Sequence, residues 1–202
     1  SVLGNWSFEK LDVCGQVQHL RVYDIDAANV QAAMTQLTHE CESAVLRIRS
    51  GYGMLSDNIR IDGTDCAPGN ISIALLGEPS TLDVASTTLL MQQHQMAILF
   101  GASVCMQDIT LQDGQGETGG GLWVHNARLK MWRCSISNCE ATRGSGGALF
   151  LDHSVADLMR CRLVNNRAER DGGALYAHRS TTSVTGCLAE GNYAGISGGF
   201  GG

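Results

Sequence analysis

The sequence has few basic residues and no dense run of them. Its 14 lysines and arginines are scattered along 202 residues, and the formal net charge is −6 at pH 7. Proteins that bind nucleic-acid backbones or anionic membrane surfaces do so through clustered positive charge. We therefore expect no nucleic acid among the partners of this chain.

Long hydrophobic runs and metal-binding cysteine motifs are also missing. No stretch approaches the roughly 18 apolar residues that a membrane-spanning helix needs, and the longest apolar run, around residues 97–100, has the length of a strand. There is no CxxC pair, and the spacing of Cys134 and Cys139 is not typical of a zinc site. The sequence therefore predicts no membrane insertion by this chain, no bound metal and no cofactor.

What the sequence does contain is a repeat. Pairs of glycines begin at positions 119, 146, 172 and 198, at intervals of 27, 26 and 26 residues. Each repeat carries two short runs of alternating apolar residues, and none has the three- and four-residue spacing of a helix. This pattern predicts an all-β fold, a single-stranded parallel β-helix in which each repeat forms one coil. A right-handed coil is expected from the general preference of parallel crossovers.

We expect two parts in the chain. Residues 1–44 are predicted to form a lead-in strand and a capping helix, and residues 45–202 the β-helix, with the regular repeats at 119–202. At a period near 26 residues, the second part holds about six coils. One domain of this length can bury a core, and 44 % of its residues are apolar.

The helix is predicted over residues 27–43. Its apolar residues follow at spacings of four, three and four, namely Val30, Met34, Leu37 and Cys41. Asp24 or Asp26 is placed to cap the first turn. A helix laid across the open end of a β-helix protects its unpaired backbone groups. The alternative is a helix packed on the side of the coils.

The two termini raise further expectations. The chain begins at Ser1 without methionine, so either a targeting segment has been removed or the chain belongs to something longer. It stops at residues 198–202, which begin a new repeat without a capping element. An uncapped solenoid end must contact a partner, a symmetry mate or further chain.

The repeat resembles a known family. Gly-Gly-Ala-Leu stands at 146–149 and 172–175, and Leu163 and Asn166 have the spacing of an FxxN motif. These features are similar to the polymorphic outer-membrane-protein repeat, and the resemblance covers residues 119–202. Two departures are Gly121, which replaces the alanine of the first repeat, and the absence of the motif's phenylalanine. The resemblance implies a pectate-lyase-like parallel β-helix and says little about function.

Eight cysteines indicate an oxidising compartment, which means extracellular space, the cell surface or another oxidising lumen. Asn5 and Asn70 lie in glycosylation sequons, although both could equally be unmodified. Cys41 and Cys66 are the best disulfide candidates, because a bridge between them would tie the helix to the first coils.

A second group of cysteines follows the repeat. Cys134, Cys161 and Cys187 stand fifteen residues after their glycine pairs and form one inward column. Stacked neighbours could form a disulfide, but three in a row leave one unpaired, so we favour a ladder of reduced, buried thiols. Cys14, Cys105 and Cys139 are not assigned.

Two outward columns follow from the alternation. Trp123, Phe150 and Tyr176 form the first, and His125, Asp152 and His178 form the second, since the opposite parity would bury Asp152. An exposed aromatic ladder beside hydrogen-bonding groups suits stacking on sugar rings or docking of a protein. The alternative is that the rings stack on one another beneath a loop and bind nothing.

No residue is assigned a catalytic role. Asp152, His153 and Ser154 are too close in sequence to converge as a triad. Carboxylates are not aligned as calcium-dependent lyases or glycosidases of this architecture require. The His/Asp column could hold a metal or a catalytic pair, but neither is the favoured interpretation.

The turn residues are explained structurally. Asp113, Asn138 and Asn165 share one position, where stacked side chains are predicted to hydrogen-bond along the column. The glycine pairs permit positive φ and close approach of neighbouring coils.

The predicted function is a non-catalytic, rigid scaffold that docks into a larger protein or assembly. Its contact surfaces are the aromatic ladder and the uncapped last coil. The alternative is a carbohydrate-active protein that binds or cleaves an acidic glycan through Trp123, Phe150, Tyr176, His125 and His178.

Overall fold

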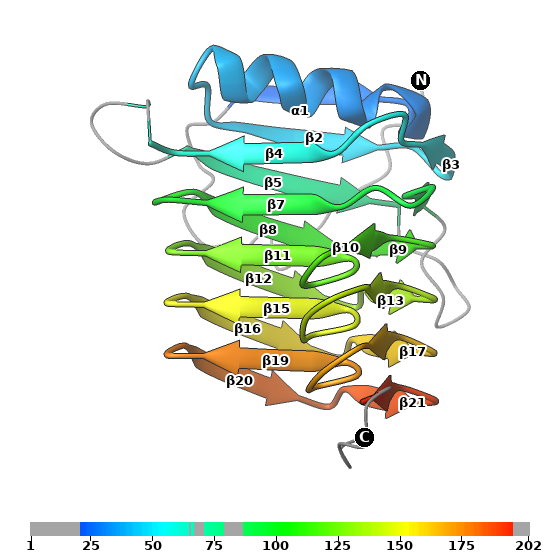
Figure 1. Ribbon diagram of the computed structural model, residues 1–202. Coiled ribbons are helices and arrows are strands. Elements are labelled where there is room, and N and C mark those ends of the chain that lie inside the picture. Colours follow the sequence, from blue (N-terminus) through cyan, green and yellow to red (C-terminus); the bar gives the residue numbers. More distant parts are fainter. Residues whose placement is uncertain (1–20, 65, 67–70, 79–86, 196–202) are drawn as a thin grey trace.

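The computed structural model describes residues 21–64, 66, 71–78 and 87–195. As the repeat predicted, these residues form an all-β solenoid of about six turns, with one short α-helix near the N-terminus. Figure 1 shows the coils stacked one above another, with the chain advancing from the helix at one end to β19, β20 and β21 at the other. Every strand pair is parallel, for example β11 with β15 and β12 with β16.

The strands form four sheets that run along the stack, here called A to D. Sheet A contains β1 (Arg21–Ile25), β2 (Ala44–Ile48), β5 (Ser72–Gly77), β8 (Ser103–Gln107), β12 (Arg128–Trp132), β16 (Val155–Met159) and β20 (Thr181–Thr185). Sheet B contains β3 (Gly51–Met54), β6 (Thr87–Leu90), β9 (Ile109–Gln112), β13 (Ser135–Ser137), β17 (Arg162–Val164) and β21 (Leu188–Glu190).

Sheets C and D complete each coil. Sheet C contains β4 (Ile59–Asp62), β7 (Met96–Leu99), β11 (Leu122–His125), β15 (Leu149–Asp152) and β19 (Leu175–His178). Sheet D contains the two-residue strands β10 (Gln115–Gly116), β14 (Glu140–Ala141), β18 (Arg167–Ala168) and β22 (Tyr193–Ala194). Residues one repeat apart therefore become neighbours, about 4.8 Å apart across a parallel ladder.

Each regular coil turns at four corners, and one residue at each corner has a positive φ, between +41° and +73°. The first corner column, between sheets C and A, contains Phe100, Asn126, His153 and Arg179. The column between sheets B and D contains Asp113, Asn138, Asn165 and Gly191. Asn, Asp and Gly are the residues that tolerate this left-handed conformation best, which explains the polar turn column in the sequence.

The glycine pairs serve two separate purposes. The first glycine of each of the three described pairs adopts a positive φ, as at Gly146, where φ is +73°. The second lies against the next coil: a Cβ added to Gly147 would lie 2.0 Å from the carbonyl oxygen of Gly173. Both predicted reasons for the pair, positive φ and close approach, are therefore confirmed.

The predicted helix is present but shorter. A 3₁₀ turn, η2 (Ala27–Asn29), leads into α1 (Val30–His39). The α-helix ends at His39, and Cys41 follows with a φ of +53°, a left-handed conformation that is incompatible with continuing the helix. Figure 1 shows α1 lying across the N-terminal end of the stack, and its buried residues Val30, Met34 and Leu37 belong to the main core. The end-capping arrangement is therefore observed rather than packing on the side.

The capping role predicted for Asp24 or Asp26 is wrong. Asp24 lies within β1, where it pairs with Arg47 of β2. Asp26 precedes η2 with extended backbone angles but makes no side-chain capping hydrogen bond. Its carboxylate instead faces Arg49, whose Nη1 lies 3.5 Å from Oδ1. The ion pair with Arg49, just after β2, therefore takes the place of the cap.

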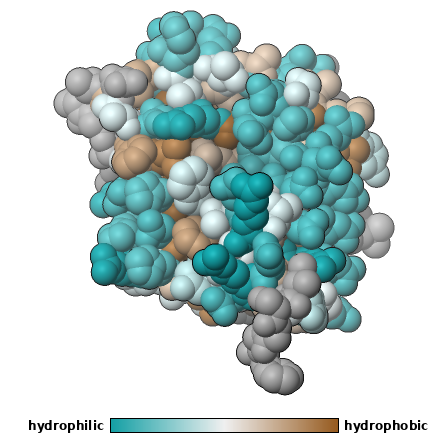
Figure 2. Space-filling model, viewed as in Figure 1, coloured by the Kyte–Doolittle hydropathy of each residue, from teal (hydrophilic) through white to brown (hydrophobic). Residues whose placement is uncertain are grey.

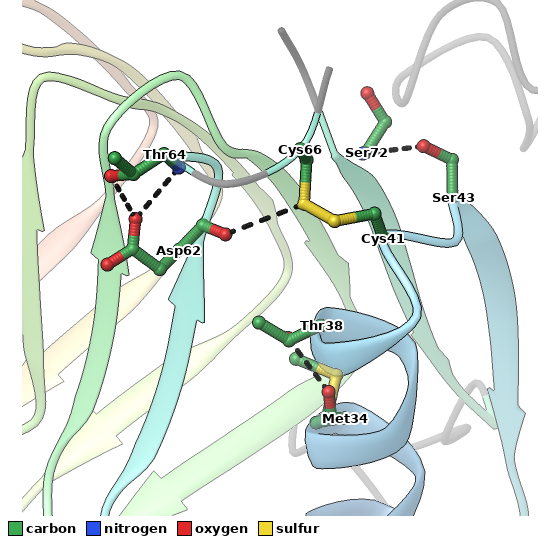
Figure 3. Close-up of a disulfide and its surroundings, with 8 residues drawn as sticks. All are labelled: Met34, Thr38, Cys41, Ser43, Asp62, Thr64, Cys66 and Ser72. Carbon is green, nitrogen blue, oxygen red and sulfur yellow. Dashed lines mark hydrogen bonds between the residues drawn. A yellow bond between two sulfur atoms is a disulfide. The ribbon is translucent and has the colours of Figure 1, made fainter. Parts of the chain in front are cut away.

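The predicted disulfide is present between Cys41, just after α1, and Cys66, after β4 (Figure 3). The two Cα atoms are 5.3 Å apart, and the bridge closes a separation of 25 residues. A loop of this length contributes about 3.5 kcal/mol to stability on a chain-entropy argument. Beside the bridge, Thr64 donates its N–H and its hydroxyl to Asp62 Oδ1 at 2.9 and 2.6 Å (Figure 3). The disulfide is compatible with an oxidising environment.

The repeating cysteines are free thiols. Cys134 and Cys161 are buried, and Cys187 is half-buried. The Cys187 Sγ accepts the backbone N–H of Cys161 at 3.2 Å, so the column contributes hydrogen bonds as well as packing. Burial raises the pKa of Cys134 and raises that of Cys139, outside this column, to about 12. The reduced ladder favoured from the sequence agrees with this arrangement.

Within the part of the chain that the structure describes, no helix has the length and apolar character needed to cross a membrane. Asn5, Asn70 and Cys14 lie outside the described residues, as do the last seven positions of the chain.

Candidate binding surface on sheet C

The aromatic column lies on the outer face of sheet C, as predicted. Trp123, Phe150 and Tyr176 are register partners on β11, β15 and β19, and all three are half-buried. Leu122 and Val124, which flank Trp123, are completely buried and fix the parity of the strand. In Figure 2, which shows this side of the molecule, hydrophobic residues form small patches among hydrophilic ones.

The three rings do not form one continuous ladder. Phe150 and Tyr176 are stacked, with centroids 5.4 Å apart and ring planes 17° apart. Trp123 instead lies near His125, at 6.2 Å and 35°. One coil earlier the column continues with Ala97, so the aromatic series begins at β11. Part of the aromatic area is thus used in contacts within the column.

The second outward column forms a compact cluster around one carboxylate. Asp152 Oδ2 lies 2.7 Å from Nδ1 of His125, one coil earlier. Asp152 Oδ1 lies 2.8 Å from Nδ1 of His178, one coil later, and 2.8 Å from Nδ1 of its neighbour His153. Three imidazoles therefore surround a single carboxyl group, whose side chain is 20 % exposed.

Two features of the chain create this cluster. The repeat places His125, Asp152 and His178 in one register column of parallel strands, so they meet without any long-range coincidence. His153 enters differently, because it occupies the corner after β15 with a φ of +49°. That corner orients its imidazole toward the carboxylate of the preceding residue. The alternation rule predicted the first three members and missed His153.

Electrostatics favour the charged form of the carboxyl group. Burial alone would raise the pKa of Asp152, but hydrogen bonds from His178, His125 and His153 outweigh it and lower the pKa. A carboxylate that accepts several N–H groups is stabilised as the anion. Asp152 is therefore the acceptor at the centre of the cluster.

His125 is held from other sides as well. The Phe100 ring meets it edge to face, with centroids 5.1 Å apart and planes 85° apart. The side-chain amide nitrogen of Asn126 lies 2.9 Å from its Nε2. Both ring nitrogens of His125 thus have a polar partner, Asp152 at Nδ1 and Asn126 at Nε2.

Ser154 does not join the cluster. Its hydroxyl donates to the backbone carbonyl of Asp152 at 2.7 Å and accepts the N–H of Ala127 at 3.2 Å. The side chain is buried between coils, so it cannot act as a nucleophile toward a surface ligand. This geometry agrees with the prediction that Asp152, His153 and Ser154 do not form a catalytic triad.

The polar ladder lies one residue later than predicted. Asn138 and Asn165 occupy a corner with φ of +54° and +55°, and among the described residues neither side chain makes a hydrogen bond. Asn166, completely buried, accepts the Cys139 N–H at 3.0 Å and donates to Asn192 Oδ1 at 3.0 Å. The corner reverses the side-chain direction, so Asn138 and Asn165 point outward and the next residue points inward. The predicted hydrogen-bonding role of Asn138 and Asn165 is therefore wrong.

The last described coil presents a different surface. Val184 is 55 % exposed, whereas its register partner Leu158, one coil earlier, is 1 % exposed. Ala177 and Ala189 are likewise exposed at positions that are buried one coil earlier. Strands β19 to β22 are each the outermost member of their sheet. At this end of the stack, apolar side chains from columns that are buried in the earlier coils are exposed, next to the unpaired edges of the last strands among the described residues.

Comparison with known proteins adds no relative: no family model, curated protein or solved structure matches this chain significantly. The resemblance of the repeat to the polymorphic outer-membrane-protein type therefore stays a prediction.

Proposed function

We propose that this chain is a non-catalytic scaffold that docks into a larger protein or assembly, with its last described coil as one contact surface. The observation that carries the proposal is the exposure of core columns at this coil, where Val184 is 55 % exposed against 1 % for Leu158. The surface that we propose to cover this coil is a further coil of parallel strands within that protein or assembly. Such strands would pair with the edges of β19 to β22 and cover the apolar side chains.

The rest of the fold suits this role. At the opposite end α1 and the Cys41–Cys66 disulfide close the stack, so docking is directed to one end. Between the two ends, sheets A, B and C run along the stack, sheet D joins them from β10 onward, and neighbouring coils pair strand by strand, as in other solenoids. We further propose that the outer face of sheet C, with Trp123 and its column, serves as a lateral contact. The proposed location is extracellular, cell-surface or in another oxidising lumen.

Glycan binding is the competing function, and the geometry supports it less. Stacking on sugar needs free ring faces, whereas Phe150 and Tyr176 are stacked on each other. The carbohydrate hypothesis would gain support if the protein bound a member of a polysaccharide panel and the variants Trp123→Ala and Tyr176→Ala lost that binding.

The docking proposal is tested by the native mass of the particle that carries this chain. We expect a defined particle heavier than the chain, with cross-links from the last coil to a second polypeptide. Val184→Lys should release the chain, since it places a charge among apolar contacts. Val155→Lys is the matched control, because Val155 is 46 % exposed on the outer side of sheet A, one coil earlier.

Three results would overturn docking into a larger protein or assembly of this kind. A wild-type particle of single-chain mass is the first, and equal behaviour of the two lysine variants is the second. A particle of two identical chains would replace the proposed partner by a second copy.

A further inference from the structure

We propose that His125, Asp152 and His153 form a binding site for a divalent transition-metal ion of the zinc type. The potential ligand atoms of these three residues all lie within 4.8 Å of one another. Imidazole nitrogen together with a carboxylate oxygen is a ligand set that suits Zn²⁺ and related ions better than Ca²⁺ or Mg²⁺. This proposal is independent of the docking function. It departs from the sequence-based prediction that the chain binds no metal.

The required rearrangement is small. Tetrahedral zinc holds N and O ligands at about 2.0–2.2 Å, which places two ligand atoms roughly 3.3 Å apart. Nδ1 of His125 and Nδ1 of His153 now lie 2.7 and 2.8 Å from the Asp152 oxygens. The His125–Oδ2 pair therefore needs to open by about half an ångström to admit the ion, and His153, which now contacts Oδ1, has to turn toward Oδ2. Both imidazoles lie at the surface side of the coil, where their side chains have room to rotate toward the ion.

Metal binding exchanges hydrogen bonds for coordination. In the present geometry each Nδ1–H donates to Asp152. A ligand nitrogen must offer its lone pair, so the proton of a neutral imidazole moves from Nδ1 to Nε2, and any imidazolium loses a proton to solvent. The carboxylate charge that now accepts these N–H groups then compensates the charge of the ion.

Asn126 provides the outer support that such a tautomer needs. Its side-chain amide lies 2.9 Å from Nε2 of His125. Oxygen and nitrogen of an amide exchange places on a 180° rotation, and the oxygen would accept the Nε2–H of the metal-binding tautomer. The Phe100 edge packs against the same ring at 5.1 Å and limits its orientation.

His178 has a related supporting role. Its Nδ1 lies 2.8 Å from Asp152 Oδ1 and would hold the carboxylate in place while Oδ2 faces the ion. Three protein ligands leave one position of a tetrahedral site open for water or for a donor from another molecule. The site would therefore be able to bind an external ligand through the metal.

The test is a titration of the whole purified chain with Zn²⁺, followed by calorimetry and by competition with a chromophoric chelator. We expect one ion per chain, and at least tenfold weaker binding in His153→Gln and in Asp152→Asn. His39→Gln is the matched control, because His39 is an exposed histidine on α1, outside the cluster. Equal affinity in His153→Gln and His39→Gln would overturn the site, as would the absence of binding by the wild type.

Two further measurements keep the test independent of folding. Asn126→Gly retains the corner, since glycine accepts the φ of +48° found there, and should weaken Zn²⁺ binding tenfold or more. Co²⁺ bound to the wild-type chain should show the visible absorption of a four-coordinate ion with nitrogen ligands. A six-coordinate, water-like Co²⁺ spectrum would argue against the proposed ligands, even if Asp152→Asn did not fold.

Discussion

Replacing Asn166 by alanine should destabilise the solenoid more than any exposed polar substitution. The side chain is completely buried between coils. Its oxygen accepts the backbone N–H of Cys139 at 3.0 Å, and its nitrogen donates to the carbonyl of Ile136 and to Asn192 Oδ1, each at 3.0 Å. One amide thus joins three successive coils.

The magnitude follows from the groups that alanine would leave behind. A buried donor or acceptor that loses its partner costs roughly 1–3 kcal/mol. Asn166→Ala removes the partner of the Cys139 N–H and one donor to the Ile136 carbonyl, while Asn192 Oδ1 keeps the backbone N–H of residue 166. Two affected groups give a loss of about 2–6 kcal/mol in the free energy of unfolding.

Urea unfolding of the disulfide-intact protein, followed by far-UV circular dichroism, measures this loss. With a slope of about 2 kcal/mol per molar urea, the midpoint should fall by roughly 1–3 M. Asn138→Gly is the control, because its side chain is exposed and glycine accepts the φ of +54°. A midpoint for Asn166→Ala within the error of the control would refute the argument that this amide holds the coils together.

Three other predictions concern separate parts of the fold. Gly147→Ala should lower the melting temperature, because its Cβ would lie 2.0 Å from a carbonyl oxygen of the next coil; Gly186→Asn, at a φ of +62° with no atom nearer than 3.7 Å, should not. Burial alone would raise the pKa of Asp62, but hydrogen bonds to its carboxylate lower it. Urea midpoints against pH should therefore show wild type more stable than Asp62→Asn at neutral pH, with the difference lost as pH falls below about 4; a constant difference would contradict this. Burial raises the pKa of Cys139 to about 12, so mass spectrometry should find it unalkylated by iodoacetamide at about pH 8 in the folded protein and modified after unfolding.

The solenoid could be predicted from the sequence because its geometry is a simple function of spacing. Residues one period apart lie side by side, so the glycine pairs, the column of Trp123 and the column of His125 could each be assigned before any coordinates. Alternation then separated inward from outward positions within a strand. The Cys41–Cys66 bridge followed from the expected position of the helix at one end.

The polar caps of the helix could not be predicted in this way. Asp26 has the residue type and the position of an N-cap, yet its carboxylate faces Arg49, which directly follows β2. Sequence spacing identifies which residues are able to cap, but competition from a cation brought by β2 depends on the tertiary arrangement. The same limit applies to the choice between packing on the end and packing on the side, which the core around Met34 decides.

The corners explain the remaining errors, and they also create the chemistry of the cluster. A residue with positive φ interrupts the two-residue period, so parity counted along one strand does not continue into the next. Asn165 at such a corner points outward, and Asn166 after it points into the core. By the same effect His153, which alternation leaves without an assigned side, contacts the carboxylate of Asp152. A column of corner residues read separately from the strand columns would have placed His153 beside Asp152, and with it the third ligand of the proposed metal site.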